Sequence, residues 1–532
     1  MIVLKKLFLR YLVLVCSGFF FNVVFNNITL FVLLNFLENI FFGATLIIPI
    51  FLLKGLNFKS LYFKLSYVVF ALCLYIETIY YYLFQTFFSS SAIFVTLDSN
   101  TNESKEFLSF YVDLPIIIYS IIFSLIVFFA IKNTKRLFKL KVFPERTAQR
   151  IKISLLFLIC IVFIKLTSLI NFNLPYLILK SVVDYNIESK KLGDYKTNKT
   201  GDFNDVYRYM DDQDEVYVII IGESTARSHM GIYNYYRATT PRLNSIKDEL
   251  LIYQDVISPH AYSVGALTKI LTLGNYEAPE LITEGSILQL LNSVGFETYW
   301  LSNQRPIGPY ESMITKIGLS SKNHEFLTTT LAGNSKVLDG ELLAPLNRIL
   351  REKVSKKVIF VHMMGTHHHY ENRYPETFNK FKDTPKTNFK SNESFEKINH
   401  YDNAILYNDF IISEIIKQVN SLKAKSFVLY FSDHAEEMYD TINMAGHNED
   451  IYSRQMFEIP FFVWQSNKFK QQENFPFITN RKYMVDDFFH SMADLLDIKA
   501  KEIDSTRSIF SKYFKERKRI IKDTVNFDTY FK

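Results

Sequence analysis

The sequence predicts two fold classes in one chain: an N-terminal all-α membrane domain of five transmembrane helices, and a C-terminal α/β/α domain. Long apolar segments fill the first third of the 532 residues. Residues 1–180 carry 17 Lys or Arg against 7 Asp or Glu, whereas the remaining 352 residues have a net charge of −4. Short β-branched apolar runs separated by helical patterns follow further along the chain.

Five apolar segments each come close to the ~20 residues that a bilayer core requires: residues 7–25, 28–53, 61–84, 112–131 and 153–170. No small-residue cleavage site follows the first segment and four more spans do, so we expect an anchor and not a cleaved signal. The chain's three cysteines, Cys16, Cys73 and Cys160, lie in these segments. The rest of the chain therefore has no disulfide framework.

Basic residues in alternate loops set the expected orientation. They precede the first segment, separate the second from the third, and number eight between the fourth and the fifth. The loop of residues 85–111 has only Lys105 against Asp98, Glu103 and Glu106. The positive-inside rule therefore places the N-terminus in the cytoplasm, and five spans export everything that follows. Glu77 lies at membrane depth, where we expect a polar cavity or a helix partner.

A polar connector, residues 171–214, is expected to lie over the outer membrane surface and to lead into a single α/β domain, residues 215–532. Near-continuous apolar runs at 216–221, 358–361 and 427–431 alternate with helical patterns such as 286–294 and 403–419. This pattern is typical of a parallel sheet buried on both faces. The positive charge lies between the apolar segments and not on this domain, which argues against a nucleic-acid partner.

Metal-ligand residue types follow three of the predicted strands. Glu223 follows the first run, Asp433 and His434 follow the 427–431 run, and His362 and then residues 367–369, all histidines, follow the 358–361 run. In open α/β sheets the ligand crevice lies beyond the carboxyl ends of the strands. One Asp-His pair after a strand is more often a cap, but three such strand ends together predict a metal site. Two carboxylates, an imidazole and a hydroxyl suit zinc.

Five segments resemble the lipopolysaccharide phosphoethanolamine transferases: GESTARSHMGIYNYYRATTPRL (222–243), VIFVHMMGTHHHYENRYPE (358–376), YDNAILYNDF (401–410), FSDHAEEMYD (431–440) and GHNEDIYSRQMFEIPFFVW (446–464). The resemblance implies five spans in the bacterial inner membrane and a periplasmic sulfatase-like domain of the alkaline phosphatase superfamily. The loop LDSNTNESKEFLSFY (97–111) resembles the branch that modifies the heptose-containing core, not the branch of the mobile colistin-resistance enzymes.

The resemblance implies that Glu223, Asp433 and His434 bind the catalytic zinc. The family's fourth ligand is a Thr nucleophile that opens a helix, but the segment SPHAYSVGALTKILTLG (258–274) has no Thr before its helical run. Ser263 is the best match as fourth ligand and nucleophile. We expect it to be the N-cap of residues 264–273, with its oxygen at the positive end of the helix dipole. A plain cap, with Thr268 or Ser258 as nucleophile, is the alternative.

Further site residues also come from the resemblance. His367 matches a histidine that contacts the phosphoryl group or a second zinc, and His447 matches one at the far side of the site. Asn303 and Gln304 match positions beside the headgroup. His260 either polarises Ser263 or is an exposed loop histidine. Two features depart from the family: the family has a Gly after the first histidine of the run, and the colistin-resistance relatives have disulfides in this domain.

The implied activity is transfer of phosphoethanolamine from phosphatidylethanolamine to a lipopolysaccharide (core sugar or lipid A) or another envelope acceptor, through a covalent phospho-enzyme. The implied cofactor is Zn2+, one catalytic ion with room for a second, and the implied partners include membrane lipid. A phosphoglycerol transferase and a membrane-anchored sulfatase or phosphodiesterase are the alternatives. The retained Glu, Asp and His argue against a non-enzymatic membrane sensor.

The uneven distribution of basic residues between the loops predicts a membrane topology that can be tested. Lys139 should be cytoplasmic, while Asp98 and the chain beyond about residue 171 should be exported. Reporter fusions after residues 139 and 220 should therefore show opposite activities. Finding both reporters on one side of the membrane would contradict the five-span prediction.

Overall fold

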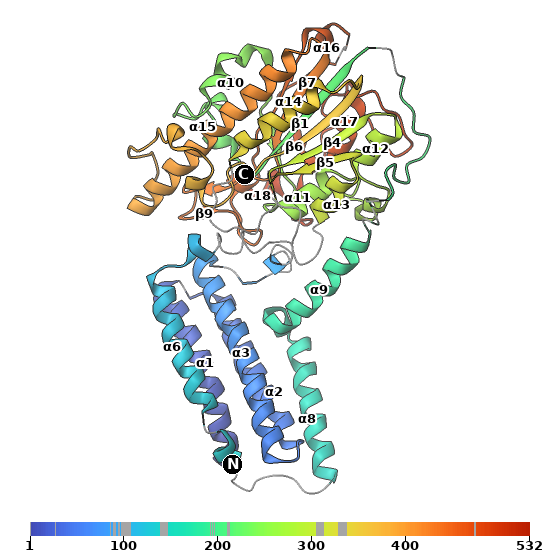
Figure 1. Ribbon diagram of the computed structural model, residues 1–532. Coiled ribbons are helices and arrows are strands. Elements are labelled where there is room, and N and C mark those ends of the chain that lie inside the picture. The colour runs from blue at the N-terminus through green and yellow to red at the C-terminus, as the bar shows by residue number, and fades with distance from the viewer. Residues whose placement is uncertain are drawn as a thin grey trace. The chain divides into compact units, whose positions relative to one another are not determined.

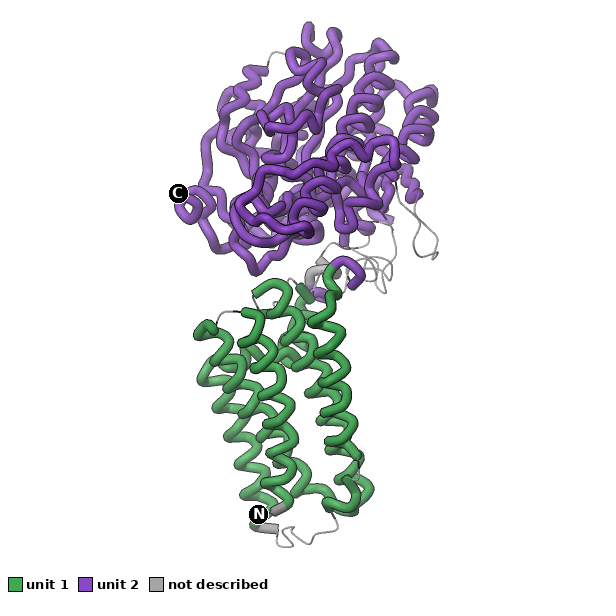
Figure 2. The backbone as a smooth tube through the Cα atoms, turned by 90° about the vertical axis from the view of Figure 1, so that its left-hand side faces the viewer, with its two compact units in different colours: residues 1–93, 111–184 green, residues 94–110, 185–532 purple. Residues whose placement is uncertain are grey.

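The computed structural model of the chain contains two compact units, residues 1–93 with 111–184, and residues 94–110 with 185–532 (Figure 2). The structure describes all residues except 1, 27, 86, 89–91, 94–95, 97–107, 133, 139–146, 192, 194, 196, 210–212, 305–312, 328–337 and 473–474. Most of the predicted outward loop, Asp98 included, and Lys139 lie outside the described residues. The predicted domain limits at 170 and 214 stay predictions.

The first unit is helical. Its helices are α1 (Ile2–Phe25), α2 (Leu30–Ile47), α3 (Leu56–Phe84), α6 (Leu114–Ile131), α7 (Thr134–Phe138), α8 (Thr147–Leu166) and α9 (Leu174–Lys191). Among the described residues, four segments are long and apolar enough to cross a membrane: Val3–Phe25, Leu30–Phe51, Leu56–Phe84 and Leu114–Ile131. Helix α8 lies at the fifth predicted span and carries Arg150, Lys152 and Lys165. The count of five is therefore not confirmed, and helix α9 was not predicted.

The buried Glu77 has the helix partners that its position in the sequence predicts. The side-chain amides of Asn35 and Asn39 in α2 each donate to Glu77 Oε2 at 3.1 Å. The backbone N–H of Leu174, the first residue of α9, donates to Glu77 Oε1 at 3.2 Å. A carboxyl group in apolar surroundings is costly without such donors. The three donors therefore connect α2, α3 and the start of α9 through one side chain.

The second unit is built on a seven-stranded sheet. Its spatial order is β2 (Leu250–Tyr253), β10 (Phe461–Gln465), β7 (Lys425–Ser432), β1 (Glu215–Gly222), β6 (Lys356–His362), β4 (Glu297–Ser302) and β5 (Asn323–Phe326). Strands β7, β1, β6, β4 and β5 are parallel, whereas β10 is antiparallel to both neighbours. The predicted parallel sheet is thus present.

Helices flank both faces of this sheet. In Figure 1, α14 (Leu343–Arg351) and α15 (Asn392–Asn420) lie on one side, and α11 (Ser263–Ile270), α12 (Ile287–Ser293), α13 (Met313–Leu319) and α17 (Phe488–Leu495) on the other. The remaining elements are short: α10 (Pro241–Ser245), α16 (Asn467–Gln472), α18 (Phe527–Tyr530), β3 (Asp255–Ile257), β8 (Glu437–Met438), β9 (Ala445–Gly446), β11 (Lys482–Met484), β12 (Ile520–Ile521) and β13 (Val525–Asn526).

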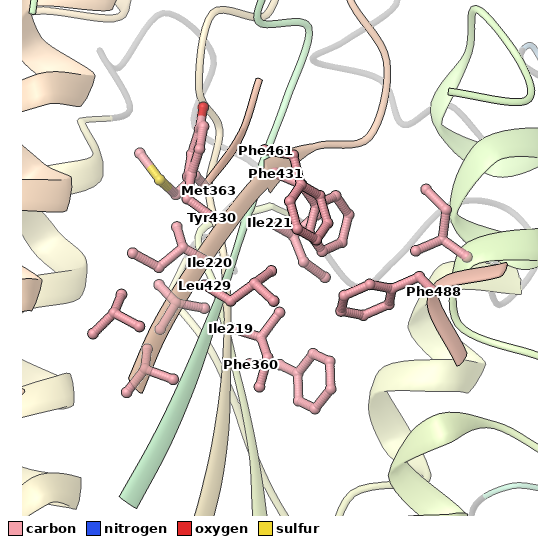
Figure 3. Close-up of a cluster of buried hydrophobic side chains, with 14 of the residues drawn as sticks. Ile219, Ile220, Ile221, Phe360, Met363, Leu429, Tyr430, Phe431, Phe461 and Phe488 are labelled. Carbon is pink, nitrogen blue, oxygen red and sulfur yellow. The ribbon is translucent and has the colours of Figure 1, made fainter. Parts of the chain in front are cut away.

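The core explains the near-continuous apolar strands. All eight residues of β1 and all eight of β7 are buried. Ile219 of β1 and its register partner Leu429 of β7 lie on one face of the sheet and Ile220 on the other, and Phe431 packs with Phe488 of α17 (Figure 3). Because helices cover both faces, alternation of polar and apolar residues is not needed. The apolar runs therefore end only where the strands end, and polar residues begin there.

A buried ion cluster, which sequence reasoning missed, holds the loop after β1. His229 Nδ1 lies 2.8 Å from Asp402 and its Nε2 lies 3.3 Å from Asp440. Arg237 donates to Asp402 at 2.8 Å. Burial acts to lower the pKa of His229, but the charges of Asp440 and Asp402 outweigh it and raise that pKa to about 10. The imidazole is therefore cationic at neutral pH.

His229→Ala should lower the free energy of unfolding by about 3 kcal/mol at pH 6, because the fully buried Asp402 loses one of its two cationic partners and keeps only Arg237. The pKa is raised on folding, so this contribution is complete below the unfolded value of about 6.5 and is lost as the pH rises towards 10. Both tryptophans, Trp300 and Trp464, lie in this unit, so their fluorescence reports its denaturation. His324→Ala, at an exposed position, is the control; equal stability of the two variants would refute the assignment.

Candidate functional site

The site lies at the carboxyl edge of the parallel strands. Strand β1 ends at Gly222 beside Ser432, the last residue of β7, so Glu223 and Asp433 emerge side by side. Strands β4 and β6 are also parallel. Residues 303–304 and the histidine run after His362 therefore lie at the same edge of the sheet. Parallel strands present their carboxyl ends on one side. The sheet thereby gathers residues that are far apart in sequence.

Four predicted residues form one compact cluster, which we call the acid–histidine cluster: Glu223, Ser263, Asp433 and His434. His434 Nε2 lies 3.2 Å from Glu223 Oε1 and 3.6 Å from Asp433 Oδ2. The Ser263 hydroxyl donates to Glu223 Oε2 at 3.0 Å and lies 3.4 Å from His434 Nε2. The side chains of Glu223, Asp433 and His434 are at most 1% exposed.

This spacing fits a tetrahedral metal ion. Ligand atoms about 2.1 Å from zinc lie roughly 3.4 Å from one another, which matches the separations in the cluster. Asp433 Oδ1 accepts the backbone N–H groups of Ser224 and His434, at 3.2 and 2.7 Å. Asp433 Oδ2 is buried and has no hydrogen-bond partner among the described residues. A buried carboxylate oxygen that accepts no hydrogen bond is suited to binding a cation.

The electrostatics of the cluster favour the binding of a cation. Burial, reinforced by the negative charge of Glu223, raises the pKa of Asp433 to about 8. Burial also acts to raise the pKa of Glu223, but the hydrogen bond and charge of His434 hold it well below its usual value. Two desolvated carboxylates this close repel each other. An ion between them would remove the repulsion.

Two glycines leave room for groups that pack closely beside Glu223. A Cβ on Gly365, whose φ is +55°, would lie 2.6 Å from the carbonyl oxygen of Glu223. The next residue, Thr366, donates its backbone N–H to that same oxygen at 3.0 Å. A Cβ on Gly222 would lie 2.5 Å from the Tyr430 hydroxyl. Only glycine fits at these positions, and Glu223 is fixed by the contacts that result.

The N-cap prediction for Ser263 is wrong. Helix α11 begins at Ser263, its N-cap is Tyr262 in an extended conformation, and no side chain caps it. The Ser263 hydroxyl bonds to Glu223 instead, at the N-terminal end of the helix. Ser258 Oγ donates to the carbonyl oxygens of His260 and Asp433. Thr268 Oγ1 is buried and has no hydrogen bond within the described part of the chain. Among the three candidates, only Ser263 contacts the cluster's carboxylates.

A second group of potential ligands lies beside the first: His368, Glu436 and His447, whose ligand atoms all lie within 4.8 Å of one another. His447 Nδ1 is 3.0 Å from Glu436 Oε1, and its ring stacks on His368 at 5.0 Å. The His447 and His434 ring centroids are 4.2 Å apart. Burial lowers the pKa of His447 to about 3, so it is neutral and able to bind a metal.

Sequence reasoning did not assign His368 or Glu436 to this second group. The available signals were the additional histidines of the 367–369 run and the acid two residues after His434. His367 is not a member of either group; its ring lies 4.9 Å from that of His368. Its predicted contact with substrate therefore stays a prediction.

The other predicted residues differ in what they contact. The Gln304 amide donates to Glu223 Oε2 at 3.1 Å, whereas the Asn303 amide donates to Asp339 at 2.8 Å. His260 is neither an exposed loop residue nor hydrogen-bonded to Ser263, because it is buried and its Nδ1 lies 2.8 Å from Glu449 Oε1. Both predicted alternatives for His260 are thus replaced by a hydrogen bond to Glu449.

Comparison with known proteins defines the class. The Sulfatase family model matches residues 215–498, more than half of the chain, so the chain belongs to the sulfatase family. It is 29% identical over 516 residues to phosphoethanolamine transferase EptC of Escherichia coli K12, covering 91% of this chain and 88% of that protein. The predicted resemblance to the lipopolysaccharide phosphoethanolamine transferases is confirmed, and the chain is a member of a transferase family.

Solved structures agree with this class. The periplasmic domain of Escherichia coli EptC, crystallised with zinc, is 31% identical with a TM-score of 0.60, covering 62% of this chain and 97% of that domain. The integral membrane lipooligosaccharide phosphoethanolamine transferase A (EptA) of Neisseria meningitidis has a TM-score of 0.71 at 20% identity, covering 96% and 98%. The second likeness shows a shared fold along nearly the whole chain.

The cluster predicts a metal content that can be measured. Purified wild-type protein should contain zinc by elemental analysis, and Glu223→Gln or Asp433→Asn should lose most of it, because each removes one of few ligands. Glu280→Gln, at an exposed position, makes the same change of charge and should retain wild-type zinc. Active wild-type protein without zinc would refute the ligand assignment.

Proposed function

We propose that the chain transfers phosphoethanolamine from phosphatidylethanolamine to a lipopolysaccharide component, lipid A or core sugar, through a phospho-enzyme on Ser263. The observation that carries the proposal is the Ser263 hydroxyl, 3.0 Å from Glu223 and 3.4 Å from His434, at the start of α11. The family supports the transferred group and the class of acceptor. A hydroxyl held among buried charged groups at a helix N-terminus is suited to covalent catalysis.

Glu223, Ser263, Asp433 and His434 would hold one zinc ion, which when bound supplies positive charge against the transferring phosphoryl oxygens. The group of His368, Glu436 and His447 offers one carboxylate and two imidazoles, a donor set that suits a second ion. Neighbouring metal sites commonly flank a transferring phosphoryl group. The proposed cofactor is thus one catalytic zinc ion, with a second metal-binding group of residues beside it.

The chemistry of the chain's own residues has two steps. In the first, Ser263 Oγ attacks phosphorus, its proton moves to the Glu223 carboxylate oxygen 3.0 Å away, and the phosphorus–oxygen bond to diacylglycerol breaks. That proton passes from Glu223 to the departing diacylglycerol oxygen, so Glu223 is again a carboxylate at the end of the step. In the second, an acceptor hydroxyl or protonated phosphate oxygen attacks phosphorus and gives its proton to Glu223, the bond to Ser263 breaks, and the proton passes from Glu223 to the serine oxygen.

The surrounding side chains would orient the donor. Gln304 and the histidines at 367 and 447 flank the acid–histidine cluster, where polar groups can bind the headgroup and its phosphoryl oxygens. The apolar helices of the first unit are proposed as a multi-pass anchor in the inner membrane, with the second unit in the periplasm. A lipid donor and a membrane-borne acceptor then meet the site at high local concentration.

Incubation of the purified full-length protein with fluorescent phosphatidylethanolamine tests the reaction. Labelled diacylglycerol should appear, and a phosphoethanolamine adduct should be trapped when acceptor is omitted. Release of diacylglycerol only from phosphatidylglycerol would instead identify a phosphoglycerol transferase. Release of free phosphoethanolamine to water without any transfer would identify a phosphodiesterase.

Ser263→Ala should abolish diacylglycerol release while the protein stays folded, because Ser263 does not cap α11. Ser263→Thr should retain activity, since the attacking oxygen stays in place. Thr268→Ala is the matched control in the same helix and should turn over near the wild-type rate. Mass spectrometry of the trapped protein should place the adduct at residue 263; an adduct on a peptide without this residue would end the hypothesis.

A further inference from the structure

The C-terminal hairpin, β12 and β13 with the turn between them, packs against the loop that leads into Ser263. Ile521 and Phe527 join Ile257 and Ala261 in a small buried hydrophobic cluster, separate from the main core. The cluster lies between the C-terminal segment and residues 257–261, directly before the nucleophile. The hairpin follows residue 498, where the match to the sulfatase family ends.

The turn of the hairpin contacts the chain on both sides of Ser263. Before it, the backbone N–H of Lys522 donates to the carbonyl oxygen of Pro259 at 2.9 Å, and Asp523 lies 3.8 Å from His260 Nε2. After it, Lys269 of α11 forms an ion pair with Asp523. One aspartate thus connects the loop before the nucleophile to the helix after it.

Glu449 also holds the loop before Ser263, through contacts with His260 and Ala261. Its Oε1 lies 2.8 Å from His260 Nδ1, and its Oε2 accepts the backbone N–H of Ala261 at 2.8 Å. The Glu449 side chain is 9% exposed and that of His260 is 7% exposed. His260 therefore lies between Glu449 and Asp523. Charge-assisted hydrogen bonds with little access to water hold a backbone more firmly than neutral, exposed ones.

The hairpin is itself anchored. Arg519, 3% exposed, bonds to Asp255 of β3 at 2.5 Å and to Asp528 beyond β13 at 3.0 Å. Strand β3 leads directly into the loop that carries Ser263. The same arginine thus joins both ends of the hairpin to the strand before that loop.

We propose that Glu449, His260 and Asp523 are positioning residues for Ser263, and that the C-terminal hairpin is the element that sets the place of the attacking oxygen. This inference rests on the proposed function of Ser263. A reacting oxygen displaced by about 1 Å costs on the order of a hundredfold in rate. Helix α11 has eight residues and no side-chain cap, so its own backbone does little to fix its first residue.

Two variants test the proposal in the full-length protein: Glu449→Gln and Asp523→Asn. Each should lower kcat for diacylglycerol release about tenfold, since the oxygen is misplaced by less than 1 Å, while KM for phosphatidylethanolamine and the zinc content stay within about twofold. Hydrogen exchange of a peptide spanning residues 255–270 should accelerate in both. Asp523→Glu should recover part of kcat. Glu516→Gln, exposed in the same C-terminal segment, is the matched control and should change neither measurement.

Accelerated exchange together with reduced kcat at unchanged KM supports the positioning role. Unchanged exchange, or accelerated exchange at wild-type kcat, overturns it, as does a fall in kcat that follows loss of zinc. Should wild-type protein release no diacylglycerol, the proposed function fails and the role in catalysis fails with it. The exchange measurement then still decides whether the hairpin holds the loop.

Discussion

The structure of the site depends on one constraint: two carboxylates, Glu223 and Asp433, are held side by side where almost no water reaches them. Their place follows from the register of β1 against β7, which ends both strands at the same level. Such a pair is unfavourable by itself. The surrounding features relieve this cost: backbone donors from residues 224 and 434, the Gln304 amide, the His434 imidazole and the space suited to a cation.

Much of this site could be predicted because the edge of a parallel sheet brings distant residues together by a general rule. The apolar runs ended where β1, β6 and β7 end, and the polar residues after them were sufficient to nominate Glu223, Asp433 and His434. No knowledge of strand order was needed, since every parallel strand presents its carboxyl end at the same edge. The sheet and most of its helices were predictable for a similar reason, because buried strands and helices differ in length and period.

The contacts that were not predicted depend on side chains that meet through loops. His260 pairs with Glu449, 189 positions away, and His229 with Asp402, 173 positions away, and neither pair belongs to a periodic pattern. The exact start of α11 also escaped prediction, because serine is a favoured N-cap residue and the sequence does not show that Glu223 takes up its hydroxyl. In the first unit, hydropathy located the apolar helices. The charged residues near both ends of α8 lower its hydropathy, so hydropathy alone does not decide whether α8 counts as a membrane span.

The position of Ser263 illustrates why the chemistry of this fold requires support from outside the sheet. Glu223 and Asp433 extend directly from strands whose residues are fully buried, so their backbones are fixed by the core. Ser263 instead begins an eight-residue helix, and helices shorter than about 12 residues are marginal in isolation. The buried residues of this helix are Val264, Ala266, Leu267 and Ile270. Packing of one face fixes the axis of a helix better than its start, so the loop before Ser263 must be held by contacts of its own, which the hydrogen bonds of Glu449 to His260 and Ala261 and the buried cluster around Ala261 provide.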